Sequence, residues 1–456
     1  MSTTLLFKDE VLNQLADSVN IAQFVSYGPD LKQRYSRLFE LEPNHQFESI
    51  LDAVWMLFKK SNGKSLNIRT YYPDSHQSQP FIYGLTEPYE VITNLIQLAD
   101  KGLYIIIHET IDVNDNGVSG ILQCGMLEFA PGVTVRFIEE STDPISVFTK
   151  KFGCELLKCV YGFAPDIDYP DTKRVEFSIH PNPIGYRQTK TIIWEIQDIK
   201  YAEIKDFNTW PTAFSKLIGD KAYGLLIGSM CGFKVPHTNV FPRNPAIDNF
   251  SFGESTGSSE VWMRTCPSES TPGKYITIRG WQDPFTLMEA DDPSGKNIVS
   301  CLSQHEVSAK YSGATLTTDN GAKIEGVQGF GDNFMLGTDK PTIIPFETFQ
   351  AITELHHRLV TRFGPVRFEW VCDLADNIWL LQLHLGKSVS SGRTIVPGEF
   401  IKSIDFDVAL GLEHLRRIID NISNNTGILV RGNIGMSSHI CDVLRKANIP
   451  SLLVSA

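Results

Sequence analysis

The sequence predicts a mixed α/β protein built from two related halves and a small C-terminal βαβ segment. The chain has 456 residues, 42% of them hydrophobic, so it is long enough for two to four domains with large cores. Both halves contain segments of helical apolar spacing and short β-branched runs. Four short motifs also recur in the same order, at offsets of 193 to 196 residues. Because the matches keep both order and spacing, they indicate duplication with divergence.

The four motifs pair segments of the first half with segments of the second. They are Ile68-Arg69-Thr70 with Met263-Arg264-Thr265, residues 83–89 with 279–285, Ser119-Gly120 with Ser312-Gly313, and residues 174–177 with 367–370. Each match is weak alone, and the argument for a repeat depends on all four together.

Apolar periodicity predicts the elements of each region. Residues 47–60 and 88–98 have helical spacing, whereas 103–107 and 192–196 are typical of strands. Pro211 lies near the join of the halves, and a polar, turn-rich stretch at 387–393 predicts a second boundary. We therefore expect three domains, over residues 1–210, 211–388 and 393–456.

The third region has the clearest local pattern. Residues 408–421 predict a helix, 427–431 a strand, 438–446 a helix and 449–454 another strand. This order predicts two parallel strands with a right-handed crossover.

Composition argues against several classes of partner. There are 53 acidic and 41 basic residues, a net charge of −12, and no block of Lys and Arg, so we expect neither nucleic acid nor a membrane surface as partner. The apolar run near the N-terminus is too short for a signal peptide, so we expect no export, and no apolar run reaches the roughly 20 residues that cross a bilayer. Eight scattered cysteines without a CxxC pair indicate reduced, packed thiols, without disulfides or zinc. These features favour a cytoplasmic protein.

Lys221 follows Gly219 and Asp220 at the start of a helical pattern. A glycine turn, a helix N-terminus and an ammonium group together favour phosphate binding. A surface lysine after a loop is the alternative interpretation.

A strand ending in Gln304-His305-Glu306 precedes glycines at 329 and 331. Gln304 and Glu306 would suit an adenine or a ribose, and the glycines would let the backbone approach phosphates. A hairpin with glycine-rich turns explains this segment equally well.

Glu369 and Gln382 lie in two strand-like runs, 368–370 and 379–384, joined by a turn-prone segment. Paired in register, their side chains would lie side by side. A carboxylate and an amide oxygen suit Mg²⁺, which keeps phosphate oxygens and waters as its other ligands. The alternative is two solvent-facing strand positions.

His439 opens a predicted helix after Ser437 and Ser438, either of which could be its N-cap. A neutral imidazole is a competent nucleophile toward phosphorus. A surface residue at the helix start is the alternative.

Taken in order, these motifs resemble the phosphohistidine dikinase superfamily, which includes phosphoenolpyruvate synthase, pyruvate phosphate dikinase and rifampin phosphotransferase. Residues 219–236 are similar to the family's GGKxxxL through GxxVP segment, 263–266 to VRSS, 280–283 to AGQxxT, 304–317 to QxMVxAxxSGVxFT, 324–337 to IEAxxGLGExxVxG, and 437–450 to TSHxAIVARExGIP. Glu369 falls on the glutamate of the family's IEW, and Gln382 on the glutamine of its LLQxRP. The resemblance covers the second half of the chain.

The resemblance implies an ATP-grasp domain over residues 211–388, a divergent ATP-grasp-like domain over 1–210 and a shortened phosphohistidine domain over 393–456. ATP and Mg²⁺ are the implied cofactors. The implied ligands are Lys221 and Arg264 for the phosphates, Gln304, Glu306 and Val307 beside the base, Glu325 for the ribose or phosphates, Gly280, Gly313, Gly329 and Gly331 along the nucleotide, and Glu369 and Gln382 for magnesium. His439 would take the β-phosphoryl group, giving AMP and phosphate, and pass it to an unidentified small molecule or protein.

The sequence departs from the family pattern in several places. Cys266 replaces the second serine of VRSS, His384 replaces the arginine after LLQ, and Asp332 replaces the glutamate of LGE. The first half keeps Arg69 and Glu176 but shows no clear counterpart of Lys221.

Three hypotheses follow. The first is an ATP-dependent phosphotransferase with a phosphohistidine intermediate. The second is a nucleotide-binding regulatory or interaction protein without turnover, and the third is one subunit of a split dikinase. A partner protein or a homo-oligomer is compatible with each of them.

Overall fold

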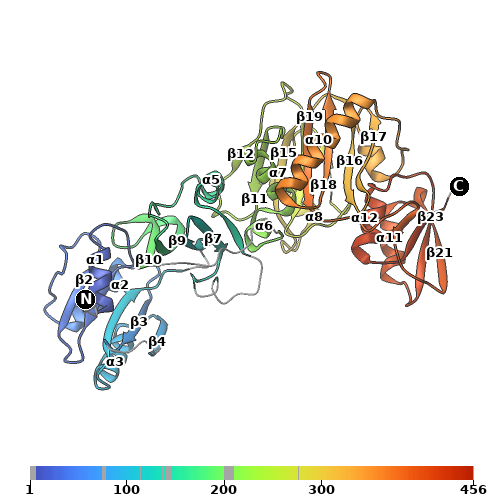
Figure 1. Cartoon of the computed structure of the whole chain (residues 1–456). Helices are drawn as coiled ribbons and strands as arrows, with labels where there is room; N and C mark the ends of the chain where they lie inside the picture. Colours follow the sequence, from blue (N-terminus) through green and yellow to red (C-terminus); the bar gives the residue numbers. More distant parts are fainter. Residues whose placement is uncertain are drawn as a thin grey trace. The chain divides into compact units, whose positions relative to one another are not determined.

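The computed structural model describes residues 7–73, 79–112, 115–135, 138, 145–199, 210–275 and 277–454 (Figure 1). The chain divides into two compact units, residues 1–207 and 208–456. Each contains helices and largely antiparallel sheets, which confirms the predicted mixed α/β class. No helix in the described part of the chain is long and apolar enough to span a membrane.

The first unit contains two five-stranded sheets. One has the order β2-β1-β5-β3-β4, with β1 Phe24–Tyr27, β2 Gln33–Arg37, β3 Leu66–Tyr71, β4 Phe81–Leu85 and β5 Tyr104–Glu109. The other has the order β10-β9-β6-β7-β8, with β6 Val118–Gln123, β7 Met126–Pro131, β8 Ser146–Thr149, β9 Lys173–Ile184 and β10 Thr189–Asp198. The helices include α1 Lys8–Leu15, α2 Ile50–Lys60, α3 Pro88–Ala99 and α5 Lys150–Tyr161.

Local sequence explains where the helices of the first unit begin. The helix predicted from residue 47 starts at Ile50, because extended Ser49 caps it by accepting a hydrogen bond from the Asp52 amide. α3 begins at Pro88, whose missing N–H costs nothing in the first turn. The strands predicted at 103–107 and 192–196 are confirmed as parts of β5 and β10.

The second unit contains three sheets. The first is β12-β11-β15-β13-β14, with β11 Thr238–Pro242, β12 Phe250–Phe252, β13 Val261–Pro267, β14 Thr277–Arg279 and β15 Ile298–His305. The second is β17-β16-β18-β19, with β16 Ala309–Thr318, β17 Gly321–Gln328, β18 Val366–Asp373 and β19 Ile378–Leu385. The accompanying helices are α6 Ala213–Ile218, α7 Asp220–Met230, α8 Pro284–Asp291, α9 Asp332–Leu336 and α10 Phe346–Phe363.

The third sheet of this unit is formed by the C-terminal residues, drawn in red in Figure 1. Its order is β20-β23-β22-β21, with β20 Thr394–Val396, β21 Lys402–Asp407, β22 Thr426–Arg431 and β23 Ser451–Val454, and its helices are α11 Gly411–Asp420 and α12 His439–Ala447. β22 and β23 run parallel across α12, as the sequence predicts. The apolar faces of α11 and α12 share one buried core with β22, through residues such as Leu415, Leu444 and Val430.

The strand orders of the first unit recur in the second. β2-β1-β5-β3-β4 matches β12-β11-β15-β13-β14, with a helix (α3 or α8) before the central strand in each. In the other sheet, β10-β9-β6-β7 matches β19-β18-β16-β17, with α5 or α10 before the β9 or β18 strand. The topology is what duplication of one ancestral unit would produce.

Candidate functional site

Two adjoining cavities in the second unit bring together most of the residues expected at the nucleotide. A cavity of about 70 Å³ is lined by Gln304, Val307, Gly313 and Gly331, among others. A cavity of about 90 Å³ is lined by Lys221, Arg264, Glu369, Gln382, His384 and His439, among others. Arg264, Asp332, Met335 and Glu369 line both cavities, which therefore adjoin.

Lys221 is placed by a tight glycine turn. Gly219 has a φ of +94°, and a Cβ there would lie 2.7 Å from the Cβ of Cys266 on β13. The turn therefore packs directly on β13 and starts α7 beside Arg264. The Lys221 ammonium donates to the Thr265 carbonyl oxygen at 3.3 Å. Burial lowers the pKa of Lys221 below its usual 10.5, and an anion bound here would favour the charged form.

Arg264 reaches across to the neighbouring sheet. Its Nη1 donates to the Leu381 carbonyl oxygen on β19 at 3.3 Å. Its Nε is buried and has no hydrogen-bond partner among the described residues. A buried guanidinium N–H without a partner is costly, and a phosphate oxygen in the cavity would satisfy it.

Glu369 and Gln382 are paired across β18 and β19, which confirms the register predicted from the sequence. The Gln382 amide nitrogen contacts Nε2 of His384, so the amide oxygen is turned away from that contact. Nδ1 of His384 lies 2.6 Å from Oδ2 of Asp220 at the start of α7. His384 thus orients the glutamine and links β19 to the start of α7.

The paired oxygens fit a magnesium site of the kind expected. In the described part of the chain, no group of three or more His, Cys, Asp or Glu side chains is arranged to hold a metal by itself. Mg²⁺ needs only one or two protein oxygens when phosphates and waters complete its octahedron. Glu369 and Gln382 would supply such a pair.

Asp332 is a site residue that the sequence reasoning did not select. It starts α9 directly after the glycine turn and lines both cavities. Burial raises the pKa of its carboxyl above 3.8, Arg264 opposes this shift, and Glu369 adds to it. In the motif resemblance to the dikinase superfamily it lies at the position of the LGE glutamate, and this was the available signal.

His439 is the first residue of α12 and lines the 90 Å³ cavity. Its Nδ1 lies 3.6 Å from Oδ2 of Asp442, one turn along the helix. Asp442 is buried and also pairs with Arg367 of β18 and, at 2.8 Å, with Nη1 of Arg445. Asp442 therefore joins the histidine helix to the sheet that carries Glu369, a connection that the sequence reasoning missed.

Two expected nucleotide ligands are placed elsewhere. Glu306 does not line either cavity, because its carboxylate accepts from Arg279 Nε and Nη2 at 2.7 and 2.9 Å and from the Trp262 indole at 3.1 Å. Glu325 accepts two hydrogen bonds from Ser437, from the amide at 2.9 Å and from Oγ at 2.8 Å. Glu325 thus anchors the loop before His439, and both carboxylates accept hydrogen bonds within the protein.

The four expected glycines also differ in their roles. Gly313 and Gly331 line the 70 Å³ cavity. Gly280 and Gly329, with φ of +92° and +78°, turn the backbone outside both cavities, and the Gly329 carbonyl accepts from Ser312 Oγ at 2.6 Å. Both glycines serve turns, and for Gly329 this agrees with the alternative hairpin interpretation.

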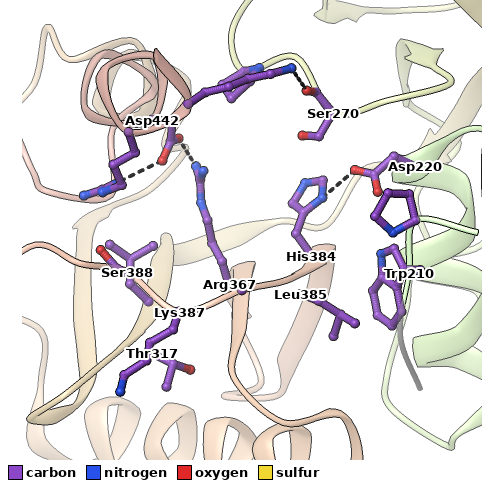
Figure 2. Close-up of a pocket in the computed structure, with 16 residues that line it drawn as sticks. Trp210, Asp220, Ser270, Thr317, Arg367, His384, Leu385, Lys387, Ser388 and Asp442 are labelled. Carbon is purple, nitrogen blue, oxygen red and sulfur yellow. Dashed lines mark hydrogen bonds and ion pairs between the residues drawn. The ribbon is translucent and has the colours of Figure 1, made fainter. Parts of the chain in front are cut away.

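A third cavity of about 340 Å³ adjoins the His439 side of the site (Figure 2). Ser270, Pro272, Arg367 and His384 line both this cavity and the 90 Å³ one. Figure 2 shows Arg367 reaching Asp442 and His384 facing Asp220, and Arg367 and His384 line both cavities.

Comparison with protein-family models finds no matching family, and comparison with curated protein sequences finds no match. Solved structures give partial matches. The D-alanine-D-alanine ligase from Coxiella burnetii is 7% identical, with a TM-score of 0.25, over 37% of this chain and 47% of that chain. Carboxyaminoimidazole ribonucleotide synthase from Aspergillus clavatus, complexed with ATP, is 10% identical, with a TM-score of 0.25, over 38% and 46%.

An ATP-grasp ligase from Chryseobacterium gregarium, associated with ribosomal peptide products and bound to ADP and peptide, is 13% identical, with a TM-score of 0.24, over 39% and 54%. The chain thus spans about half the length of these structures. At these identities and TM-scores the likeness says nothing of substrate or reaction.

Proposed function

We propose that residues 208–456 form an ATP-grasp-type unit that binds Mg-ATP and transfers a phosphoryl group to His439. One observation carries this proposal: a single cavity is lined by Lys221, Arg264, the Glu369–Gln382 pair and His439, which come from well-separated parts of the chain. Cations, metal-ligand oxygens and a nucleophile are the parts that phosphoryl transfer requires.

Lys221 and Arg264 would hold the phosphates. Burial disfavours the charged form of Lys221, and the Nε of Arg264 has no hydrogen-bond partner among the described residues. A polyphosphate would therefore gain charge-assisted hydrogen bonds without breaking existing ones. When bound at Glu369 and Gln382, Mg²⁺ would neutralise further phosphate charge. Gln304 and Val307 line the neighbouring cavity, on the side proposed for the base.

The imidazole of His439 is proposed as the nucleophile. Asp442 faces Nδ1 and favours the tautomer protonated there, which leaves the lone pair on Nε2 for phosphorus. In the dikinase reaction, Nε2 forms a bond to the β-phosphorus of ATP. The bond between the β-phosphorus and the oxygen that bridges it to the α-phosphate breaks. AMP leaves, and water releases the γ-phosphate as inorganic phosphate. The acceptor that finally receives the phosphoryl group is an unidentified small molecule or protein.

The test is to incubate the protein with Mg-ATP and quantify AMP, ADP and phosphate. We expect AMP and phosphate from the wild type and none from His439→Ala, which should still bind ATP. His357→Ala, which changes an exposed histidine on α10, is the matched control and should behave as the wild type. ADP as the only product, or AMP formation by His439→Ala, would refute the proposal.

A nucleotide-binding protein without turnover is the second candidate. The contact of His384 with Asp220 favours it, because the arginine of the dikinase motif is replaced by a side chain that already contacts Asp220 within the protein. Calorimetry with Mg-ATP combined with the product assay separates the candidates: binding without AMP supports this one, and AMP formation removes it.

A further inference from the structure

The two units share an irregularity at one point of the β9 and β18 strands. In the second unit Glu369 pairs with Gln382 and Trp370 with Leu380, so Leu381 is an extra residue. In the first unit Glu176 pairs with Glu195 and Phe177 with Ile193, so Trp194 is the extra residue. A β-bulge of this kind re-aims side chains and is typical of strands beside active sites. Glu176 and Glu195 of the first unit therefore occupy positions equivalent to those of Glu369 and Gln382 in the second unit.

Packing around this bulge also matches. Gly313 pairs with Trp370, and a Cβ on Gly313 would lie 2.8 Å from the Trp370 ring. Gly120 pairs with Phe177, and a Cβ on Gly120 would collide with the Phe177 ring. In both units a glycine makes room for the aromatic residue that follows the glutamate, so the glutamates share one setting.

The cations have counterparts as well. Arg69 pairs with Ile106 of the central strand β5, as Arg264 pairs with Leu302 of the central strand β15. Lys8 opens α1, the helix before β1, as Lys221 lies in the first turn of α7 before β11.

Lys8 lies within electrostatic range of both Arg69 and Glu195. Partial burial lowers its pKa, Arg69 lowers it further, and Glu195 opposes the shift. Lys221 responds in the same way to burial, Arg264 and Glu369. Lys8 is thus a cation near Arg69 and Glu195, as Lys221 is near Arg264 and Glu369, although α1 packs on β2 whereas α7 packs on β13 and β19.

We propose that the first unit holds a second binding site, in which Lys8 and Arg69 bind the phosphates of a metal-bound polyphosphate and Glu176 and Glu195 face its divalent cation. The inference rests on the function proposed for the matching residues of the second unit. A nucleoside triphosphate with Mg²⁺ is the ligand class.

The charges of the site support a metal-bound ligand. Glu176 and Glu195 are directly opposite each other, a position in which like charges are destabilising and a bound cation would be stabilising, and the Gln197 amide donates to Glu195 Oε1 at 2.6 Å. Arg174 offsets part of this charge by pairing with Glu176. Glu195 is at the position equivalent to Gln382, so the first unit has two carboxylates where the second has one carboxylate and one amide. Two carboxylates suit a divalent cation better than a carboxylate and an amide do.

The site is assigned to binding and not to transfer. Arg174 matches Arg367, which in the second unit holds Asp442 beside His439. β10 is the last element described in the first unit, and no described residue there corresponds to His439. A nucleotide held without a phosphoryl acceptor would serve as a regulatory ligand.

Calorimetric titration of the full chain with Mg²⁺ and the non-hydrolysable analogue adenosine 5′-(β,γ-imido)triphosphate tests the inference. Two sites per chain are expected in the wild type. The double variant Lys8→Ala/Arg69→Ala should lose one site or weaken it about tenfold or more, because charge-assisted contacts are removed. Lys101→Ala, an exposed lysine of the same unit, is the matched control. Lys221→Ala/Arg264→Ala should lose the other site.

The variants separate this inference from the proposed function. If Lys8→Ala/Arg69→Ala binds as the wild type does, the inference is wrong, whatever the second unit does. If Lys221→Ala/Arg264→Ala binds as the wild type does while Lys8→Ala/Arg69→Ala loses a site, the second-unit proposal fails and the first-unit site is supported. Should the double variant misfold, Glu195→Ala provides the same test through a raised Mg²⁺ requirement, and an unchanged requirement would overturn the inference. Tripolyphosphate in place of the analogue distinguishes a phosphate-only site from a nucleotide site.

Discussion

Asp442→Asn should weaken both the attachment of the histidine helix and phosphoryl transfer. Asp442 is 4% exposed, pairs with Arg367, contacts Arg445 Nη1 at 2.8 Å and faces His439 Nδ1 at 3.6 Å. Removing one partner of a buried ion pair costs about 3–5 kcal/mol. Asparagine keeps the shape and one acceptor, so we expect a loss of about 3 kcal/mol in the free energy of unfolding at pH 7.

The same substitution has a defined pH signature. Burial alone raises the pKa of Asp442, but Arg367, His439 and Arg445 together hold it below 3.8. A carboxyl with a lowered folded-state pKa contributes stability above its unfolded pKa and loses that contribution as the pH falls through the folded value. The difference between wild type and Asp442→Asn should therefore be full at pH 7 and shrink below about pH 3.8.

Urea unfolding followed by tryptophan fluorescence measures this difference, and AMP formation reports the chemistry. Arg431→Gln, which removes a half-exposed ion pair with Asp405 on neighbouring strands, is the control and should change stability by less than about 1 kcal/mol. Equal unfolding midpoints for wild type and Asp442→Asn at pH 7, with equal AMP formation, would refute the role assigned to this carboxylate.

Three further predictions concern the nucleotide cavity. Lys221→Met should raise the urea midpoint, because it removes an amine whose charged form is disfavoured by burial. It should also weaken Mg-ATP binding about tenfold in calorimetry. A lower urea midpoint together with weaker binding would contradict the anion-binding role. Glu369→Gln should raise the Mg²⁺ concentration needed for half-maximal AMP formation about tenfold, and an unchanged requirement would exclude Glu369 as a metal ligand. Gly313→Ala should destabilise the second unit by about 3 kcal/mol in urea unfolding, since its Cβ would meet the Glu325 carbonyl and lie 2.8 Å from Trp370, whereas Gly63→Ala, with 3.5 Å of room, should be nearly neutral.

Local pattern was sufficient where neighbours in sequence decide the structure. The β18–β19 pairing of Glu369 with Gln382 followed from two strand-like runs around a short turn, and the C-terminal βαβ order followed from apolar spacing. In both cases the relevant contacts lie within a few tens of residues, so the sequence could predict them.

Partners distant in sequence decided the rest. Glu306 forms an ion pair with Arg279 of another strand, and Glu325 accepts hydrogen bonds from Ser437 of the C-terminal segment. Local spacing in the sequence does not predict these contacts. Lys8 escaped notice because its helix is short and no glycine turn precedes it. Its place became evident only when the strand orders of the two units were compared.

The central claim is that His439 receives phosphorus from ATP, and mapping the phosphorylated residue tests it most directly. The protein would be incubated with Mg²⁺ and ATP labelled in the β-phosphate, kept at alkaline pH because phosphohistidine is acid-labile, and digested for mass spectrometry. Label on the peptide that contains His439, and its absence in His439→Ala, is the predicted result. Bound ATP with no label on the protein, or label on another residue, would contradict the account.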